Sequence, residues 1–383
     1  MATPGIAPIA ISIDAPNAGA SATHDLLAAV LRANHQISDL IFSPGRPPQI
    51  EVHGQLIPIH APGLESMTPD DTRRIASDLI GNNKQAINIL REQGSCDISY
   101  GLPGMARFRV NVFIQRGSCA IVMRVIPTVI PDFAALNLPV QLSEIAHLRK
   151  GIVLVTGPRG SGKSSTLATL LDCINEQQVC HIITIEDPIE FLHKHKRATI
   201  HQRELHIDTP SFASAMKSAL RQAPKVIMVG ELRDRETTER VIEAAETGHI
   251  VLSTVNSVNA AKTIERLTSG FSGEEQKSIR ARLAKNLSHI ISQRLLPRKD
   301  GRGRVAAIEI FKLTSRTAGA VECEDPSGQN ILETIKAGTA DGMQHFDAEI
   351  EKLVRKGIVD LQTALAHAND AHELKHTLSD FRS

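Results

Sequence analysis

The stretch VLVTGPRGSGKSST, which runs from residue 153 to residue 166, has the residue types and spacing of a phosphate-binding loop. Gly157, Gly162, Lys163 and Ser164 occupy every fixed position of the pattern GxxxxGK[ST]. Glycines let backbone N–H groups approach phosphate oxygens, and the start of the following helix adds a positive dipole end. The alternative, an ordinary glycine-rich turn, is disfavoured because an apolar run precedes the loop and the helical STLATLLDCI follows it. We assign nucleotide binding to the following residues: Gly157, Pro158, Arg159, Gly160, Ser161, Gly162, Lys163, Ser164 and Ser165.

Acidic residues follow two other apolar runs of the chain. Glu186 and Asp187 end IITIED, and Glu231 ends VIMVGE. In open parallel sheets the ligand lies at the carboxyl ends of the strands, where a carboxylate can order Mg²⁺ or polarise an attacking water. We therefore predict that Glu231 and Glu186 are catalytic and that Ser164 and Glu231 hold Mg²⁺. The alternative for each acid is a solvated side chain at a strand end.

Three further candidates rest on weaker grounds. His249 precedes the apolar run HIVLST and is included as a catalytic candidate, although a lone histidine in this position is more often structural. Hydrolysis of a triphosphate also needs positive charge near the γ-phosphate. Arg109 and Arg124 could supply it from paired strands across a subunit boundary, but solvated strand arginines are an equally good interpretation of the sequence.

The elements that must position these residues form two different patterns. Between residues 24 and 130, helical and strand-like segments mix, and the alternation in ARFRVNVFIQRGSCAIVMRVIP predicts a β-hairpin that turns at Arg116 and Gly117. After a proline-rich stretch, buried apolar runs alternate with helices, which predicts an α/β domain built on a parallel sheet. The expected strands are GIVLVTG, HIITIED, KVIMVGE, GHIVLST and RVAAIEIF.

We divide the chain on this basis into five parts. Residues 1–22 are predicted as a disordered tail, 23–135 as an α+β domain, 136–148 as a linker, 149–313 as the nucleotide-binding α/β core, and 314–383 as a helical C-terminal segment.

The composition of the chain bears on which classes of ligand it could bind. The 43 basic and 42 acidic residues nearly cancel and aromatic residues are scarce at 3%, which argues against nucleic-acid binding. No apolar run approaches the roughly 18 residues of a membrane-spanning helix. The five cysteines lack CxxC spacing, so a reduced chain without structural zinc is the simplest interpretation, with Cys173, Cys180 and His181 as a partial metal site the alternative.

Taken together, these motifs resemble the secretion ATPase superfamily, and most closely the PilT/PilU family of type IV pilus retraction ATPases of twitching motility. GPRGSGKSSTL resembles the family's Walker A motif, TIEDPIEF its Asp box, VIMVGELRDRETTERVIEAAETGH its Walker B region and AETGHIVLSTVN its His box. RFRVNVFIQRG and VMRVIP are similar to its arginine-bearing hairpin, which favours Arg109 and Arg124 as arginine fingers. LRQAP, RDRETTE and NLSHIISQRLLP are nearer to accessory PilU-type members.

The resemblance implies a PAS-like N-terminal domain and a RecA-like P-loop ATPase domain. It further implies a homo-hexamer that hydrolyses ATP with Mg²⁺ to power or assist pilus retraction. Such a ring lies in the cytoplasm at the inner-membrane face of the pilus base, beside the inner-membrane platform protein. A principal retraction ATPase is a second expected partner, and the alternative function is a weakly hydrolysing, nucleotide-gated accessory subunit.

Two departures from the family pattern bear on that alternative. The His box has Asn256 where the family usually has a second histidine. The segment SRTAGAVECEDPSGQ stands where principal motors have an AIRNLIRE-like helix. Both departures disfavour pilus retraction by this chain without a second motor, and neither disfavours ATP hydrolysis.

Overall fold

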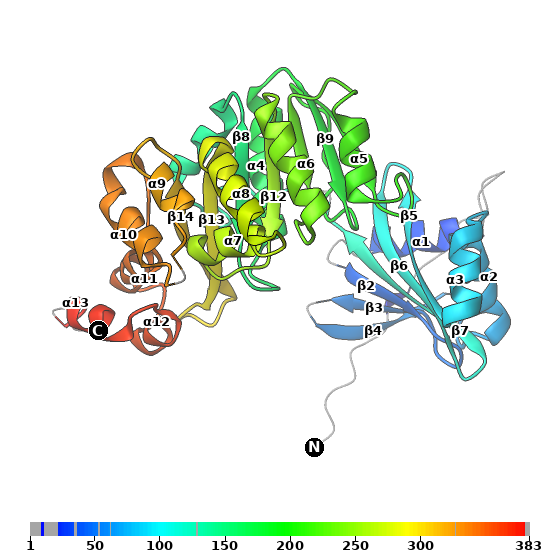
Figure 1. Ribbon diagram of the computed structural model, residues 1–383. Helices are drawn as coiled ribbons and strands as arrows, with labels where there is room; N and C mark the ends of the chain where they lie inside the picture. Colours follow the sequence, from blue (N-terminus) through cyan, green and yellow to red (C-terminus); the bar gives the residue numbers. More distant parts are fainter. Residues whose placement is uncertain are drawn as a thin grey trace. The chain divides into compact units, whose positions relative to one another are not determined.

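The computed structural model of the 383-residue chain describes residues 9–10, 22–33, 37–52, 54–61, 63–127, 129–325 and 327–379. It divides into two compact units, Met1–Thr128 and Val129–Ser383. Figure 1 shows the order of their helices and strands.

The first unit is a seven-stranded sheet with helices packed on one face. The strand order is β1-β4-β3-β2-β7-β6-β5, antiparallel except where β1 pairs with β4. Side chains of α1, α2 and α3 share a core with alternate residues of β6 and β7. The elements are β1 (Ile9–Ala10), α1 (Ala22–Ala33), β2 (Ile37–Phe42), β3 (Gln49–Val52), β4 (Gln55–His60), α2 (Pro69–Ile80), α3 (Lys84–Gln93), β5 (Ser95–Leu102), β6 (Ala106–Gln115) and β7 (Ser118–Ile126).

Local sequence explains where these elements begin and turn. Helix α2 starts with a capping box between Thr68 and Asp71, with a proline in its first turn. The predicted hairpin is present as β6 and β7, and its turn residues Arg116 and Gly117 both have positive φ, at 48° and 75°. Alternation leaves the helix-free face of this sheet with polar side chains, including Arg109 and Arg124, which are both exposed.

The second unit is a seven-stranded sheet with the order β10-β9-β11-β12-β8-β13-β14. The four strands β9, β11, β12 and β8 are fully or nearly fully buried and mostly apolar, as a sheet covered on both faces requires. All neighbouring pairs are parallel except β13 and β14. The elements are η1 (Val140–His147), β8 (Gly151–Thr156), α4 (Lys163–Gln177), β9 (His181–Glu186), β10 (Thr199–Glu204), α5 (Phe212–Ala219), β11 (Val226–Val229), α6 (Arg235–Glu246), β12 (Ile250–Val255), α7 (Ala260–Thr268), α8 (Gly273–Asn286), β13 (Leu287–Pro297) and β14 (Arg304–Lys312).

Helices cover both faces of this sheet. One core joins the sheet to α5 through α8, together with α9 (Ala318–Glu322) and α10 (Gln329–Ala337). The opposite core joins it to α4 and η1. A third, smaller core packs α11 (Phe346–Arg355), α12 (Leu361–His367) and α13 (Ala371–Thr377) against β13 and β14, after the short η2 (Thr339–Asp341).

The structure confirms the α/β class and differs from the sequence expectations in detail. The expected strand RVAAIEIF, β14, is antiparallel rather than parallel, because only a short loop joins it to β13. Strands β10 and β13 were not predicted. Segment 136–148, predicted as a linker, contributes Leu142 and Ile145 to the core against α4. Within the predicted tail, Ile9–Ala10 form β1, and residues 1–8 and 11–21 lie outside the described residues.

Among the described residues, no helix has the length and apolar character needed to cross a membrane. All five cysteines are free thiols. No group of three or more His, Cys, Asp or Glu side chains in this part of the chain is arranged to hold a metal ion.

Candidate nucleotide-binding site

The glycine-rich loop joins the carboxyl end of β8 to the first turn of α4, as the motif requires. Gly162 has a φ of 87°, and a Cβ there would lie 2.8 Å from Nε2 of Gln293. Gln293, in β13, donates to the carbonyl of Ser161 at 2.7 Å and accepts from Oγ1 of Thr166 at 2.7 Å. The loop is therefore held from the neighbouring strand by a buried amide. Sequence reasoning missed Gln293, because the two residues that it contacts lie 127 and 132 residues earlier in the chain.

Lys163 lies folded over this loop. Its Nζ donates to the carbonyls of Gly157 and Pro158, at 3.0 and 2.9 Å. Burial lowers the pKa of the Lys163 ammonium, opposed by the charge of Glu231. The lysine thus makes no ion pair within hydrogen-bonding distance, and its charge is available to a phosphate that takes the place of the two carbonyls.

Glu186 ends β9 as a buried carboxyl group with 6% of its surface exposed. Burial raises its pKa to about 7, although Thr184 and Gln202 donate hydrogen bonds to it at 2.6 and 3.0 Å. The backbone N–H of Glu190 also points to it, at 3.4 Å. A carboxyl group with a pKa near neutral can hold or release a proton under ordinary conditions, which suits a general base.

Glu231 follows β11 and has both carboxylate oxygens engaged. The Asn256 amide donates to Oε1, and Nε of Arg233 donates to Oε2 at 2.8 Å. Arg233 also approaches Asp187, with Nη1 3.7 Å from Oδ2. Glu231, Asp187 and Asn256 come from three adjacent strands, β11, β9 and β12, because their carboxyl ends meet at one edge of the sheet.

Lys163, Glu186 and Glu231 line one cavity of about 270 Å³. The loop and helix α4 form one side of it, and the ends of β9, β11 and β12 form the other. Its polar lining includes the following predicted residues: Arg159, Gly160, Lys163, Ser164, Glu186 and Glu231. Asp187, Glu190, His193, Arg233, Thr254 and Asn256 also line it.

The structure does not bring the other candidates to this cavity within the second unit. His249 precedes β12, so it lies at the opposite edge of the sheet, about 20 Å away for a six-residue strand. Its Nδ1 faces the Ala244 carbonyl at 2.9 Å, a local structural contact. Arg109 and Arg124 belong to the first unit, where they lie directly opposite each other on β6 and β7.

The cavity suits a magnesium ion bound together with a triphosphate. Ser164 and Glu231 both line it and supply hydroxyl and carboxylate oxygens, the hard ligands that Mg²⁺ prefers. Mg²⁺ commonly takes only one or two protein ligands and completes its shell with phosphate oxygens and water. At Gly162 a Cβ would lie 2.8 Å from Nε2 of Gln293, so this position needs glycine for the loop to pack against β13.

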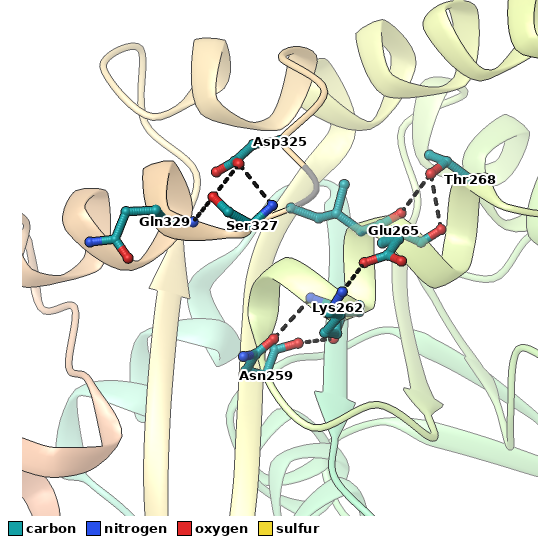
Figure 2. A network of polar contacts seen from close by, with 9 residues as sticks. Asn259, Lys262, Glu265, Thr268, Asp325, Ser327 and Gln329 are labelled. Carbon is teal, nitrogen blue, oxygen red and sulfur yellow. Dashed lines mark hydrogen bonds and ion pairs between the residues drawn. The ribbon is translucent and has the colours of Figure 1, made fainter. Parts of the chain in front are cut away.

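The chain after Asn256 is firmly fixed. Asn259 caps α7 by accepting from the Lys262 backbone at 2.9 Å, and Lys262 pairs with Glu265 at 2.6 Å (Figure 2). The buried Glu309 of β14 accepts from the Ala260 backbone at 2.9 Å. Asn256 therefore lies in a short segment anchored at both ends, by β12 and by α7.

Helix α7 is also the docking surface for the segment that begins α10. Asp325 and Ser327 form a turn before it, with Ser327 Oγ donating to Asp325 at 2.6 Å (Figure 2). Gly328 in this turn is so close to α7 that an added Cβ would lie 2.8 Å from Cβ of Ala261.

A parallel sheet with a phosphate-binding loop after β8 and carboxylates on the adjoining strand ends defines a P-loop ATPase domain. The family model described as "Type II/IV secretion system protein" matches residues 92–367. Among curated proteins, the Pseudomonas aeruginosa type IV pilus retraction ATPase PilT is 41% identical over 87% of this chain and 94% of its own length. The Pseudomonas aeruginosa type IV pilus ATPase PilU is 37% identical over 88% of this chain and 87% of its own length.

Solved structures agree. A crystal structure of the pilus retraction motor PilT with bound ADP has a TM-score of 0.81 and 38% identity, and covers 93% of this chain and 99% of its own. The structure of the Legionella pneumophila ATPase DotB has a TM-score of 0.70 and 27% identity, and covers 93% of this chain and 99% of its own. The chain belongs to the type II/IV secretion system protein family and, within it, to the PilT/PilU pilus retraction ATPases. The resemblance read from the sequence is thereby confirmed, and the likeness to PilU is consistent with the expected accessory type.

Proposed function

We propose that this chain hydrolyses ATP with Mg²⁺ in the cavity between the glycine-rich loop and the ends of β9, β11 and β12, and so powers or assists type IV pilus retraction. The observation that carries the proposal is the convergence of Lys163, Glu186 and Glu231 on that cavity. The membership of the PilT/PilU family supports the link to the pilus.

Each residue has a role that follows from its position. Lys163 exchanges the two loop carbonyls for β- and γ-phosphate oxygens, and the loop N–H groups hold the rest of the phosphate chain. Ser164 and Glu231 hold Mg²⁺, which when bound neutralises charge on the β- and γ-phosphates. Glu186, as the carboxylate, accepts a hydrogen bond from the attacking water and orients it.

The arginine pair is proposed to complete the site from a neighbouring subunit. Arg124 and Arg109 are cross-strand neighbours, an arrangement that like charges disfavour unless an anion lies between them. Asp39, on the adjacent β2, accepts from Nε of Arg124 at 3.0 Å. This contact fixes the plane of the guanidinium and leaves its two terminal nitrogens for a phosphate, because the Arg124 side chain is 69% exposed.

The proposed assembly is a homo-hexamer in the cytoplasm, at the inner-membrane face of the pilus base, where it contacts the platform protein. A ring is a closed set of heterologous contacts, so each subunit can lend its arginines to the next. A PAS-like first unit and a RecA-like ATPase second unit belong to the same proposal, with the division at Thr128 and Val129 rather than at residue 135.

A mixing experiment tests the shared site. Lys163→Ala and Arg124→Ala subunits are each expected to be inactive in ATP hydrolysis. In rings assembled from equal parts of both, roughly one site in four pairs an intact loop with an intact arginine, so about a quarter of wild-type turnover returns. Light scattering confirms that all rings have the same mass. Absence of recovery in rings of the proper mass contradicts an arginine acting between subunits.

A second candidate function is favoured by Asn256 and by the segment SRTAGAVECEDPSGQ. In it, the chain is an accessory subunit that binds nucleotide, hydrolyses it slowly and acts with a principal retraction ATPase. Turnover measured alone and with such a motor separates the two: a rate that rises only with the motor supports the accessory function, and a high rate alone supports the independent motor.

A further inference from the structure

Arg233 occupies the acidic end of the candidate site. It donates from Nε to Oε2 of Glu231 at 2.8 Å and places Nη1 3.7 Å from Oδ2 of Asp187. The two carboxylates belong to the ends of β11 and β9, so the guanidinium bridges two strands across the cavity that it lines. Because Asn256 donates to the other oxygen, Oε1, both carboxylate oxygens of Glu231 accept a hydrogen bond.

This contact concerns the same carboxylate that is proposed to hold Mg²⁺. A guanidinium on Oε2 repels a divalent cation that binds the same carboxylate and already neutralises its charge, so the two cations compete for Glu231. The Arg233 side chain is 55% exposed and that of Glu231 is 17% exposed. Exposed ion pairs are weak, so Arg233 can be displaced at little cost.

The next arginine in the sequence shows that the placement is specific. Arg235 turns away from the cavity and forms a bidentate pair with Glu275 of α8, at 2.6 and 3.2 Å. Arg233 is thus the basic residue of this turn that faces the carboxylates of the site.

We propose that Arg233 is an internal counter-ion that competes with the divalent cation for Glu231. In the nucleotide-free chain it neutralises Glu231 and Asp187, and it releases Glu231 when Mg²⁺ arrives with a nucleotide. The inference rests on the proposed function, which assigns Mg²⁺ to Glu231 and Ser164. As a consequence, Arg233 raises the Mg²⁺ concentration at which the cation binds with nucleotide. It also keeps Glu231 paired with a protein cation until Mg²⁺ is bound.

The test is a magnesium titration of the full-length protein with a fluorescent, non-hydrolysable ATP analogue. The measured quantity is the apparent dissociation constant for Mg²⁺, read from nucleotide fluorescence rather than from activity. Arg233→Gln is expected to lower that constant about two- to fivefold, the range set by the strength of an exposed ion pair. Arg233→Lys retains a positive charge that can still reach the carboxylates and is expected to lie between the wild type and Arg233→Gln.

Arg240→Gln is the matched control, because it makes the same charge change on α6, where Arg240 pairs with Glu243 of its own helix at 2.8 Å. It is expected to titrate as the wild type does. An equal or higher constant for Arg233→Gln overturns the inference, and so does an equal fall in Arg240→Gln, which would indicate long-range charge alone. If the wild type itself binds the analogue without any dependence on Mg²⁺, the proposed function fails instead.

Discussion

Glu186→Gln offers the sharpest test of the electrostatics of the site. Burial raises the pKa of Glu186 from 4.5 to about 7, so the folded chain binds this proton more tightly than the unfolded chain does. The contribution of Glu186 to stability is therefore fully present below pH 4.5 and is lost as the pH rises to about 7. A difference of about 2.5 pKa units corresponds to roughly 3 kcal/mol.

Glutamine has the shape of the protonated acid and retains an oxygen that can accept from Thr184 and Gln202. It does not titrate, so the variant lacks this part of the pH dependence. The assay is urea denaturation of the nucleotide-free protein between pH 4.5 and pH 8. The free energy of unfolding of the wild type minus that of Glu186→Gln should fall by roughly 3 kcal/mol over this range.

Glu274→Gln is the control, because the Glu274 side chain is 92% exposed and its replacement should leave the pH profile unchanged. A difference between wild type and Glu186→Gln that stays constant from pH 4.5 to pH 8 would refute the assignment of Glu186 as a buried acid with a raised pKa.

Three other predictions follow from the described contacts. Asp39→Asn should lower ATP turnover by less than Arg124→Ala does, because it weakens the contact that orients the Arg124 guanidinium without removing the guanidinium. Equal losses of turnover in phosphate-release assays contradict an orienting role for Asp39. Gly328→Ala should destabilise the chain by about 1–3 kcal/mol more than Gly342→Ala, measured by denaturation. Both positions have positive φ, but only at Gly328 does the added Cβ meet a neighbouring side chain. Asn256→His, at matched hexamer content, should modestly raise turnover if the side chain next to Glu231 couples hydrolysis to movement, and equal rates make the replacement neutral.

Much of the second unit could be predicted because its signals are local. Continuous apolar runs identified β8, β9, β11 and β12, and the glycine spacing located the loop between β8 and α4. Since parallel strands present their carboxyl ends at one edge, the meeting of Lys163, Glu186 and Glu231 followed from the order of motifs alone.

Other features depend on contacts between distant segments. Gln293 contacts the loop from 131 residues further along the chain than Gly162, and no local pattern marks such a pairing. The antiparallel β14 reads as an apolar run like the parallel strands, because burial on both faces removes the alternation that would distinguish it. His249 precedes β12, and a residue before a strand lies at the far edge of the sheet from a residue after it.

ATP turnover by Glu231→Gln, measured together with ATP binding in the same hexameric preparation, tests the central claim most directly. We expect the variant to bind ATP about as tightly as the wild type, because Lys163 and the loop are intact. We expect it to release phosphate at least about 100-fold more slowly, because it lacks a carboxylate ligand for Mg²⁺. Phosphate release at a rate near that of the wild type, with binding unchanged, would contradict the assignment of this cavity as the site of hydrolysis.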